Sequence, residues 1–178
     1  MKICVYAICK NEEKFIERWY ESVKEADGIY VLDTGSTDNS VNLLKSLGVV
    51  VRQEIISPWR FDIARNKSLE MIPDDFDICI CLDLDEVLEK GWSKTIKSLW
   101  KDGLTRLRYV YNWSLDKNNK PIISFYGEKI HKRKGFTWVN PVHEILKYKG
   151  EEKYLYTDKV IVNHYPDSKK SRSSYLPL

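Results

Sequence analysis

Apolar and polar positions follow two rhythms in the first half of the chain. Continuous apolar runs predict strands buried on both faces, and apolar residues spaced three or four apart predict helices with one buried side. The strand-like runs are 2–9, 28–33, 49–54 and 76–83. The helical segments between them are 11–26, a stretch with Val41, Leu44 and Leu47 in register that ends at Gly48, and 60–72. This order, β-α-β-α-β-α-β, predicts an α/β fold with a mostly parallel central sheet and helices on both faces.

The second half changes character after a predicted helix at 90–100. Short, aromatic-rich segments dominate it and predict a small, antiparallel, β-rich part of the fold. These segments are 105–115, 121–126, 136–139 and 159–165. The length of 178 residues suits one domain with a real core. We expect that domain at 1–166, followed by a loose, solvated tail at 167–178.

Composition narrows the class of protein. Apolar residues make up 43% and charged residues 31% of the chain, as in ordinary soluble proteins, and a net charge of +3 is too small to indicate a nucleic-acid or membrane partner. No segment reaches the ~20 apolar residues of a membrane span, and the apolar run at the N-terminus is too short for a signal peptide. Eleven Tyr and six Trp suit either a core or platforms that stack on sugar rings or bases.

The four cysteines indicate a reducing compartment. Cys4, Cys9, Cys79 and Cys81 all fall in predicted strands, and their spacing is neither that of a zinc site nor that of a redox CxxC. Cys79 and Cys81 are two residues apart, so their side chains should share one face of their strand. We therefore expect reduced, mostly buried thiols in a cytoplasmic protein.

Three carboxylates follow the apolar strand at 76–83. Asp83 and Asp85 would share a face on extended backbone, with Glu86 turned away. At the rim of a parallel sheet, where ligands bind, two such oxygen ligands suit Mg²⁺ or Mn²⁺. The alternative is a solvated acidic turn or the start of a helix.

A second informative turn, LDTGSTDNSV, follows the strand at 28–33. A capped βα loop explains Gly35, Ser36 and Thr37 completely. It does not explain Asp33 at the carboxyl end of a strand, where a carboxylate can accept from a base N–H or a ribose hydroxyl. The absence of GxGxxG and GxxxxGK[ST] from the sequence disfavours dinucleotide and P-loop chemistry.

Four segments together resemble family 2 glycosyltransferases: ICKNEEKFIERWYESV, VLDTGSTDNSV, FDIARNKSLE and CLDLDEVL. Their order and spacing are most similar to a bacterial subgroup with the motifs DTGSTD, ARN, LDxDE and W-x(n)-VHE, over roughly 2–146. The resemblance implies the GT-A fold, nucleotide-diphosphate sugars as donors and inversion at the transferred sugar. It also implies a nucleotide-binding half at 1–88 and an acceptor half at 89–166.

The resemblance assigns the nucleotide to residues of the first half. Ala7, Ile8 and Asn11 match the segment that lies along the nucleotide, and Asp33 matches the residue that reads the base. Arg65, in ARN, matches a residue that faces the base or the diphosphate. Taken alone, the position of Arg65 favours a charge on the surface of a helix.

The metal assignment also follows from the resemblance. Asp83 and Asp85 match the DxD motif, in which the second Asp holds the divalent ion and the first meets the ribose or the ion. Such an ion neutralises the diphosphate as leaving group. Glu86 is expected to support the loop. His164, after the apolar run IVN, is a candidate third ligand, although a lone His after a strand is often structural.

Inverting transfer needs a carboxylate that takes the proton of the acceptor hydroxyl. In FTWVNPVHEIL, Glu144 resembles the VHE acid of the subgroup and is the predicted base, with His143 beside it. The alternative for both is a surface turn after Pro141. His131 is expected to be structural, and the neighbouring Lys129, Lys132, Arg133 and Lys134 are expected to form a solvated basic edge.

Two rival functions stay open. LDLDEVL also resembles the nucleophile loop of haloacid-dehalogenase-type phosphatases, but that loop lies near the start of its domain and needs a later Lys and acidic pair. The short second half also leaves room for a non-catalytic nucleotide- or sugar-binding module, or a transferase subunit that needs a partner, although the intact DxD and Glu144 argue against simple decay.

The resemblance favours an inverting, metal-dependent transferase that moves a hexose from a nucleotide-diphosphate sugar, with a UDP-sugar as the family's usual donor. The possible acceptors are a glycan, a lipid-linked sugar, a protein or a modified nucleic acid. Assembly of the chain into a homo-oligomer is also left open. Thr34 stands where many relatives have a second Asp, so the identity of the base is open.

Overall fold

A computed structural model describes residues 1–167 of the chain. The tail predicted at 167–178 lies outside the described residues except for Asp167, which forms an ion pair with Lys14. No helix within residues 1–167 is long and apolar enough to cross a membrane.

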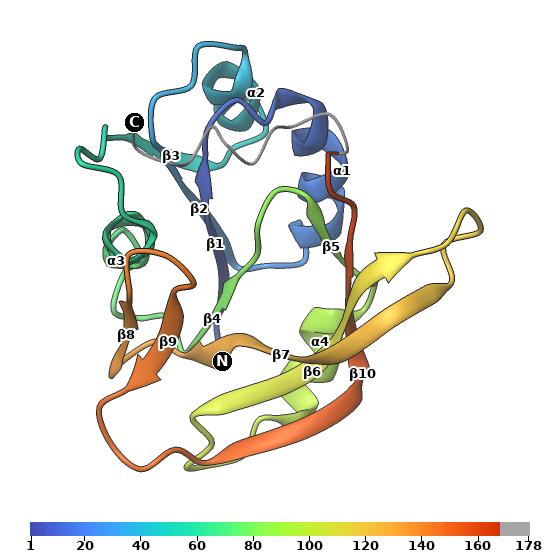
Figure 1. Ribbon diagram of the computed structural model, residues 1–178. Coiled ribbons are helices and arrows are strands. Elements are labelled where there is room, and N and C mark those ends of the chain that lie inside the picture. The colour runs from blue at the N-terminus through green and yellow to red at the C-terminus, as the bar shows by residue number, and fades with distance from the viewer. Residues whose placement is uncertain (168–178) are drawn as a thin grey trace.

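One large sheet organises the molecule (Figure 1). Its strands, in spatial order, are β3 (Val50–Gln53), β2 (Gly28–Asp33), β1 (Ile3–Cys9), β4 (Ile78–Cys81), β7 (Pro121–Lys132), β6 (Arg106–Leu115), β10 (Tyr154–His164) and β5 (Glu86–Leu88). The strands β1 to β4 are mutually parallel, β7 runs antiparallel to β4 and β6, and β10 is parallel to β6 but antiparallel to β5. A separate antiparallel hairpin pairs β8 (Phe136–Val139) with β9 (Ile145–Tyr148).

Helices cover both faces of this sheet. The helices α1 (Glu13–Val23), α2 (Ser40–Ser46) and α4 (Trp92–Leu99) bury apolar residues in one core together with the inward side chains of β1 and β4. On the opposite face, α3 (Phe61–Glu70) and the β8–β9 hairpin enclose a second core. Because β1 and β4 are buried on both faces, they have no polar alternation, and the continuous apolar runs of the sequence reflect this.

The first core also fixes the exit of β4. Trp19 of α1 is fully buried, and its indole nitrogen donates a hydrogen bond of 3.2 Å to the carbonyl of Leu82. Leu82 directly precedes Asp83, so the packing of α1 holds the start of the acidic turn in place.

The predicted fold class is confirmed, and every predicted strand and helix is present. Two short strands, β5 and β9, were not predicted, and β7 continues six residues beyond the predicted end at 126. The cysteines are free and buried, as expected. Cys79 and Cys81 share the core of the second face, where the Cys79 sulfur lies 3.4 Å from that of Cys4.

His131 is structural, as predicted. It is fully buried; its Nδ1 donates to the carbonyl of Lys132 at 2.8 Å, and its Nε2 accepts from the Tyr6 hydroxyl at 3.0 Å. The indole of Trp138 donates in turn to the Tyr6 oxygen at 2.9 Å. This chain of hydrogen bonds needs a neutral imidazole, and burial lowers the pKa of His131 to about 3.

Acid is therefore expected to weaken the fold through His131. The unfolded imidazole binds a proton below its ordinary pKa of about 6.5, whereas the folded one does so only near 3, so stability present above pH 6.5 is lost as the pH falls. At about 1.4 kcal/mol per pH unit, wild type should lose about 2 kcal/mol more than His131→Gln between pH 7 and pH 5. Urea unfolding at both pH values measures this. His143→Gln, at an exposed residue, should keep the wild-type dependence, and equal losses in His131→Gln and wild type would contradict the assignment.

Candidate active site

The acidic segment after β4 forms a tight turn. The amide of Glu86 donates to the carbonyl of Asp83 at 2.9 Å, and the amide of Asp83 donates back to Glu86 Oε2 at 2.9 Å. The expectation of extended backbone, with Glu86 turned away, is therefore wrong, because the chain reverses here to enter β5. Glu86 is 3% exposed and supports the loop, as its position in the motif led us to expect.

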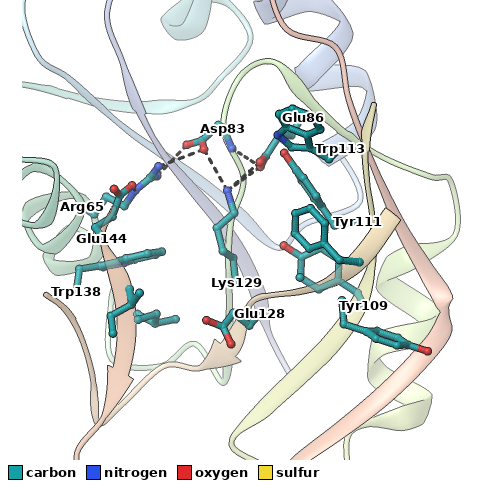
Figure 2. Close-up of a pocket in the computed structure, with 15 residues that line it drawn as sticks. Arg65, Asp83, Glu86, Tyr109, Tyr111, Trp113, Glu128, Lys129, Trp138 and Glu144 are labelled. Atoms are coloured by element: carbon teal, nitrogen blue, oxygen red, sulfur yellow. Dashed lines mark hydrogen bonds and ion pairs between the residues drawn. The ribbon is translucent and has the colours of Figure 1, made fainter. Parts of the chain in front are cut away.

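Two cations hold the carboxylate of Asp83 (Figure 2). Arg65 donates from Nη1 to Oδ1 at 2.8 Å and from Nη2 to Oδ2 at 3.1 Å, and Lys129 Nζ lies 3.1 Å from Oδ2. Lys129 also reaches both oxygens of Glu86, at 2.9 and 3.0 Å. Burial would raise the pKa of Asp83, but the attraction of Arg65 and then of Lys129 outweighs it and holds that pKa well below its usual range. Burial raises the pKa of Glu86, although Lys129 opposes the shift.

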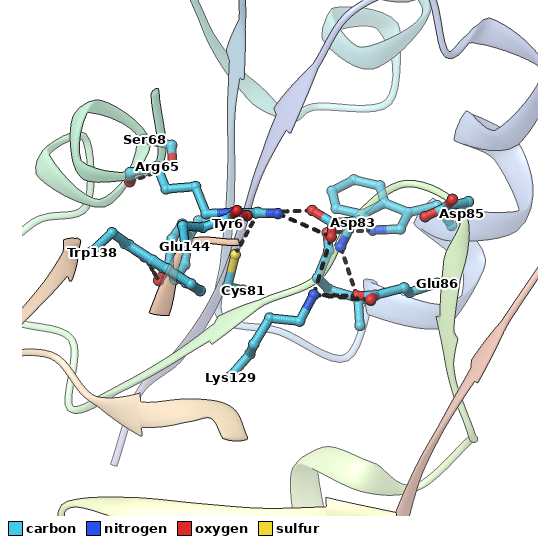
Figure 3. A network of polar contacts seen from close by, with 12 residues as sticks. Tyr6, Arg65, Ser68, Cys81, Asp83, Asp85, Glu86, Lys129, Trp138 and Glu144 are labelled. Carbon is cyan, nitrogen blue, oxygen red and sulfur yellow. Dashed lines mark hydrogen bonds and ion pairs between the residues drawn. The ribbon is translucent and has the colours of Figure 1, made fainter. Parts of the chain in front are cut away.

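Arg65 joins the two halves of the chain. Its Nε donates to Glu144 Oε1 at 2.6 Å, so one guanidinium bonds both Asp83 and Glu144, as Figure 3 shows. The guanidinium also lies over the ring of Trp138, 5.1 Å from its centroid. Arg65 is 6% exposed and is not the helix-surface charge that its position alone allows.

Asn66 fixes the β8–β9 hairpin that carries Glu144. Its side-chain amide donates to the carbonyl of Trp138 and accepts from the amide of Trp138, both at 2.9 Å. The two neighbouring residues of ARN thus have different roles: Arg65 bonds the carboxylates of Asp83 and Glu144, and Asn66 aligns β8 with α3. The role of Asn66 was not predicted from the sequence.

Asp85 and His164 lie together at the edge of the sheet. His164 Nε2 is 3.3 Å from Asp85 Oδ2, and Nδ1 is 3.0 Å from the carbonyl of Trp113. A carbonyl only accepts, so Nδ1 carries a proton and Nε2 faces the carboxylate. Burial would lower the pKa of His164, but the hydrogen bonds to Asp85 and to the Trp113 carbonyl raise it.

This pair suits a divalent cation in its chemistry. A metal-binding imidazole usually donates one ring N–H to a carbonyl or carboxylate, as Nδ1 of His164 does to Trp113, and its other nitrogen is then oriented towards the ion. Within residues 1–167, no group of three or more His, Cys, Asp or Glu side chains is arranged to hold an ion. Asp85 and His164 would hold one together with water and phosphate oxygens, whereas both oxygens of Asp83 already accept from cations.

Two cavities meet at the Arg65–Asp83 pair. The aromatic cavity, of about 440 Å³, falls within the range of small-molecule sites. It is lined by Arg65, Asp83, Glu86, Tyr109, Tyr111, Trp113, Phe125, Tyr126, Gly127, Glu128, Lys129, Trp138, Glu144, Ile145 and Leu146. The strand-end cavity is lined by Ile8, Cys9, Lys10, Glu12, Thr34, Trp59, Phe61, Arg65, Asp83, Leu84 and Asp85. Glu144 belongs to the first cavity and Asp85 to the second.

Of the residues predicted to contact a nucleotide, some line the strand-end cavity and others are buried behind it or bonded within the neighbouring turn. Ile8 lines the strand-end cavity, whereas Ala7 and Asp33 are fully buried. The Asp33 carboxylate accepts from the amides of Gly35 and Ser36 and so caps its own turn. Asn11 accepts from the amide of Thr37 at 2.7 Å, which ties the end of β1 to the same turn.

Lys129 and two aromatic residues were missed by sequence analysis. Lys129 was assigned to a solvated basic edge, which is wrong, because the extension of β7 carries it under the acidic turn. The assignment fits Lys134, which is exposed. Trp59 and Phe61 line the strand-end cavity with their rings 5.1 Å apart, and their clustering at the start of α3 was the available signal.

Comparison with known proteins gives a family. The sequence matches the model of Glycosyl transferase family 2 over residues 4–148. An uncharacterized glycosyltransferase of Rickettsia bellii is 38% identical over 100 residues, which are 56% of this chain and 33% of the relative. The lipopolysaccharide core biosynthesis glycosyltransferase LpsC of Rhizobium meliloti is 24% identical over 166 residues, 90% of this chain and 56% of the relative. The chain thus spans between a third and just over half of these curated relatives.

Solved structures share the fold. TarS of S. aureus, in complex with UDP-GlcNAc, superposes with a TM-score of 0.52 at 17% identity, covering 66% of this chain and 36% of TarS. Glucosyl-3-phosphoglycerate synthase of Mycobacterium tuberculosis, in complex with Mn²⁺, UDP and glucosyl-3-phosphoglycerate, superposes with a TM-score of 0.53 at 20% identity, covering 75% of this chain and 57% of the synthase. At these identities the likeness establishes the GT-A fold.

Proposed function

The chain belongs to glycosyltransferase family 2, and from this premise we propose that it moves a hexose from a UDP-sugar to an acceptor hydroxyl by a single inverting displacement that needs a divalent ion. The observation that carries the proposal is the meeting of two cavities at Arg65 and Asp83. One cavity includes Asp85 of the metal-suited pair, and the other includes Glu144, the proposed carboxylate base. Donor and acceptor would thus approach each other across one guanidinium.

The donor nucleotide occupies the strand-end cavity in this proposal. Trp59 supplies a flat ring there, and its indole nitrogen is buried with no hydrogen-bond partner in the described part of the chain. A buried donor of this kind favours a ligand that brings an acceptor atom. Ile8 lies beside the ribose and Asp83 faces the sugar diphosphate. Ala7, Asn11 and Asp33 support the strand ends that form this cavity, through burial and through hydrogen bonds within the turn after β2.

Asp85 and His164 are the proposed ligands of the divalent ion. A cation held there neutralises the charge that develops on the diphosphate leaving group. Glucosyl-3-phosphoglycerate synthase, of the same fold, has been solved with UDP and either Mn²⁺ or Mg²⁺. Trp113 supports this assignment, because its carbonyl holds His164 with Nε2 towards Asp85.

Glu144 is the proposed base. It takes the proton of the acceptor hydroxyl as that oxygen attacks the anomeric carbon and the bond to the diphosphate breaks on the opposite side. The hydrogen bond from Arg65 Nε holds one oxygen of Glu144, which leaves the other for the acceptor. Arg65 also orients Asp83, so the base and the donor-facing carboxylate keep a fixed relation.

The phosphatase alternative loses its support. Asp83 would be its nucleophile, yet both oxygens of Asp83 are engaged by Arg65 and Lys129. The match to family 2, over residues 4–148, also covers the LDLDEVL segment. The buried free thiols favour a reducing compartment, and we propose a cytoplasmic location on that basis.

Calorimetric titration of UDP and GDP, with and without Mn²⁺, tests the proposal. We expect Mn²⁺ to strengthen UDP binding at least tenfold in wild type, about 1.4 kcal/mol, and Asp85→Ala to remove that gain. Asp102→Ala, at an exposed carboxylate beyond α4, should behave as wild type. Failure of both nucleotides to bind would overturn the proposal. Binding without release of UDP from any UDP-sugar would support the non-catalytic module instead.

A further inference from the structure

Three exposed tyrosines form a row on one face of the sheet. Tyr126 of β7 packs edge-to-face on Tyr156 of β10 at 4.8 Å, and Tyr156 packs on Tyr154 at 5.7 Å. Strand register explains the row, because Tyr126, Tyr156 and Tyr154 pair with Val110, Arg108 and Arg106, alternate residues of β6 that point the same way. We call these three residues the tyrosine ladder.

The ladder stays open to solvent. Its members are 48%, 49% and 50% exposed, which is unusual for side chains of this size in contact with one another. Arg108 lies under them, 4.8 Å from the ring centroid of Tyr154 and 5.6 Å from that of Tyr156. Arg108 is held in turn by Glu128 at 3.1 Å. The rings of Tyr154 and Tyr156 thus pack on a guanidinium that an ion pair holds in place.

The ladder is continuous with the aromatic cavity. Tyr126 and Glu128 both line that cavity, in which the proposed base Glu144 lies. A ligand whose end reaches Glu144 would therefore leave the cavity past Tyr126 and meet Tyr156 and Tyr154 next. The direction of exit is set by β6, which carries the paired residues of all three tyrosines.

Charge selects against an anionic ligand. The described lining of the cavity carries four carboxylates, Asp83, Glu86, Glu128 and Glu144, against two cations, Arg65 and Lys129. Both cations are already paired with these carboxylates, and Glu128 is paired with Arg106 and Arg108, which lie outside the lining. A phosphate or carboxylate on the ligand would therefore find no unpaired cation in this described lining, whereas hydroxyl groups can donate to the acidic oxygens.

We propose that the tyrosine ladder is an acceptor subsite for an uncharged glycan, whose end sugar enters the aromatic cavity and whose following sugars lie on Tyr156 and Tyr154. The inference rests on the proposed function and adds the class of acceptor. The C–H faces of sugar rings pack on the negative faces of aromatic rings, and hydroxyls bond the polar rim. A lipid surface fits less well, since the cation of the ladder, Arg108, is bound to Glu128.

Binding of uncharged sugars of increasing length tests the subsite. The probes are glucose, maltotriose, cellotriose and chitotriose, with tri-galacturonate as the anionic comparison and phosphatidylcholine–phosphatidylglycerol vesicles as the lipid comparison. NMR titration in the presence of Mn²⁺ and UDP gives each affinity. We expect at least one uncharged trisaccharide to bind tenfold or more tightly than its single sugar, and the double variant Tyr154→Ala/Tyr156→Ala to lose that gain.

Two further variants keep the test specific. Tyr154→Phe/Tyr156→Trp should retain the length gain because it keeps the rings. Ile122→Ala/Ile123→Ala, at exposed residues of β7 outside the ladder, should behave as wild type. An unchanged gain in the alanine double variant, preference for tri-galacturonate, ladder-dependent vesicle binding, or no uncharged trisaccharide bound would each overturn the inference. Binding of UDP with Mn²⁺, measured in the same samples, reports separately on the proposed function.

Discussion

Replacing Glu144 with glutamine is expected to lower the rate of sugar transfer by about 10²–10⁴-fold, the contribution of a general base. Glutamine keeps an oxygen that accepts from Arg65 Nε, so the hairpin and the cavity should keep their shape. It cannot take a proton from the acceptor. Binding of UDP with Mn²⁺ should therefore change by no more than about threefold, a difference of less than 1 kcal/mol.

Release of UDP from UDP-glucose, UDP-galactose and UDP-GlcNAc, with the best sugar acceptor or with water, measures this effect. Glu151→Gln, which removes an exposed carboxylate in the loop after β9, is the matched control and should keep wild-type rates. Rates within tenfold of wild type in Glu144→Gln would place the base elsewhere. Parallel loss of UDP binding would instead mean that Glu144 holds the site together through Arg65.

The local pattern of apolar residues predicted most helices and strands, because each of these elements is buried on one whole side or on both faces. The strands β1 and β4 are apolar throughout, and β2 is apolar as far as Leu32, since helices or the β8–β9 hairpin cover both of their faces. The strand β5 was missed because three residues beginning with a glutamate carry no such pattern. Its pairing with β10 is nevertheless what sets His164 opposite Glu86 and so beside Asp85. Contacts between residues nearly 80 positions apart leave no local trace.

Arg65 shows where the sequence held more information than its charge suggests. It lies four residues after Phe61 and four before Leu69, on the apolar side of the predicted helix, and its burial follows from that position. Lys129 gave no comparable signal. It lies in a run of basic residues, and only the pairing of β7 with β4, together with the irregular register against β6, turns it towards Asp83 and Glu86.

Loss of the Arg65 guanidinium is expected to destabilise the fold by about 3–5 kcal/mol, because Arg65→Met removes the cation bonded to Glu144 and two of the three hydrogen bonds that cations donate to Asp83. Urea unfolding at pH 7 measures the loss. Lys67→Met on the same helix removes a surface ion pair with Glu54 and should cost no more than about 1 kcal/mol. Arg65→Lys keeps the charge but not the fork that bonds two carboxylates, so it should recover stability in part and transfer hardly at all.

A double-mutant cycle with Asp83→Asn separates pairing from packing. Because the pKa of Asp83 is lower in the folded than in the unfolded chain, its ionised carboxylate stabilises the fold above the unfolded pKa of about 3.9, and this stabilisation is lost as the pH falls. Arg65→Met should therefore make the free energy of unfolding depend less on pH in the acid range. If the guanidinium acts on Asp83 through charge, Arg65→Met should cost about 1–3 kcal/mol less in the Asp83→Asn background. Equal costs in both backgrounds would show that Arg65 stabilises the fold by its packing on Trp138 and its bond to Glu144. In the described lining of the two cavities, Arg65 is the one side chain that bonds both Asp83, on the proposed donor side, and Glu144, the proposed base. A coupling of this size would mean that the positions of donor and acceptor are set together, through Arg65.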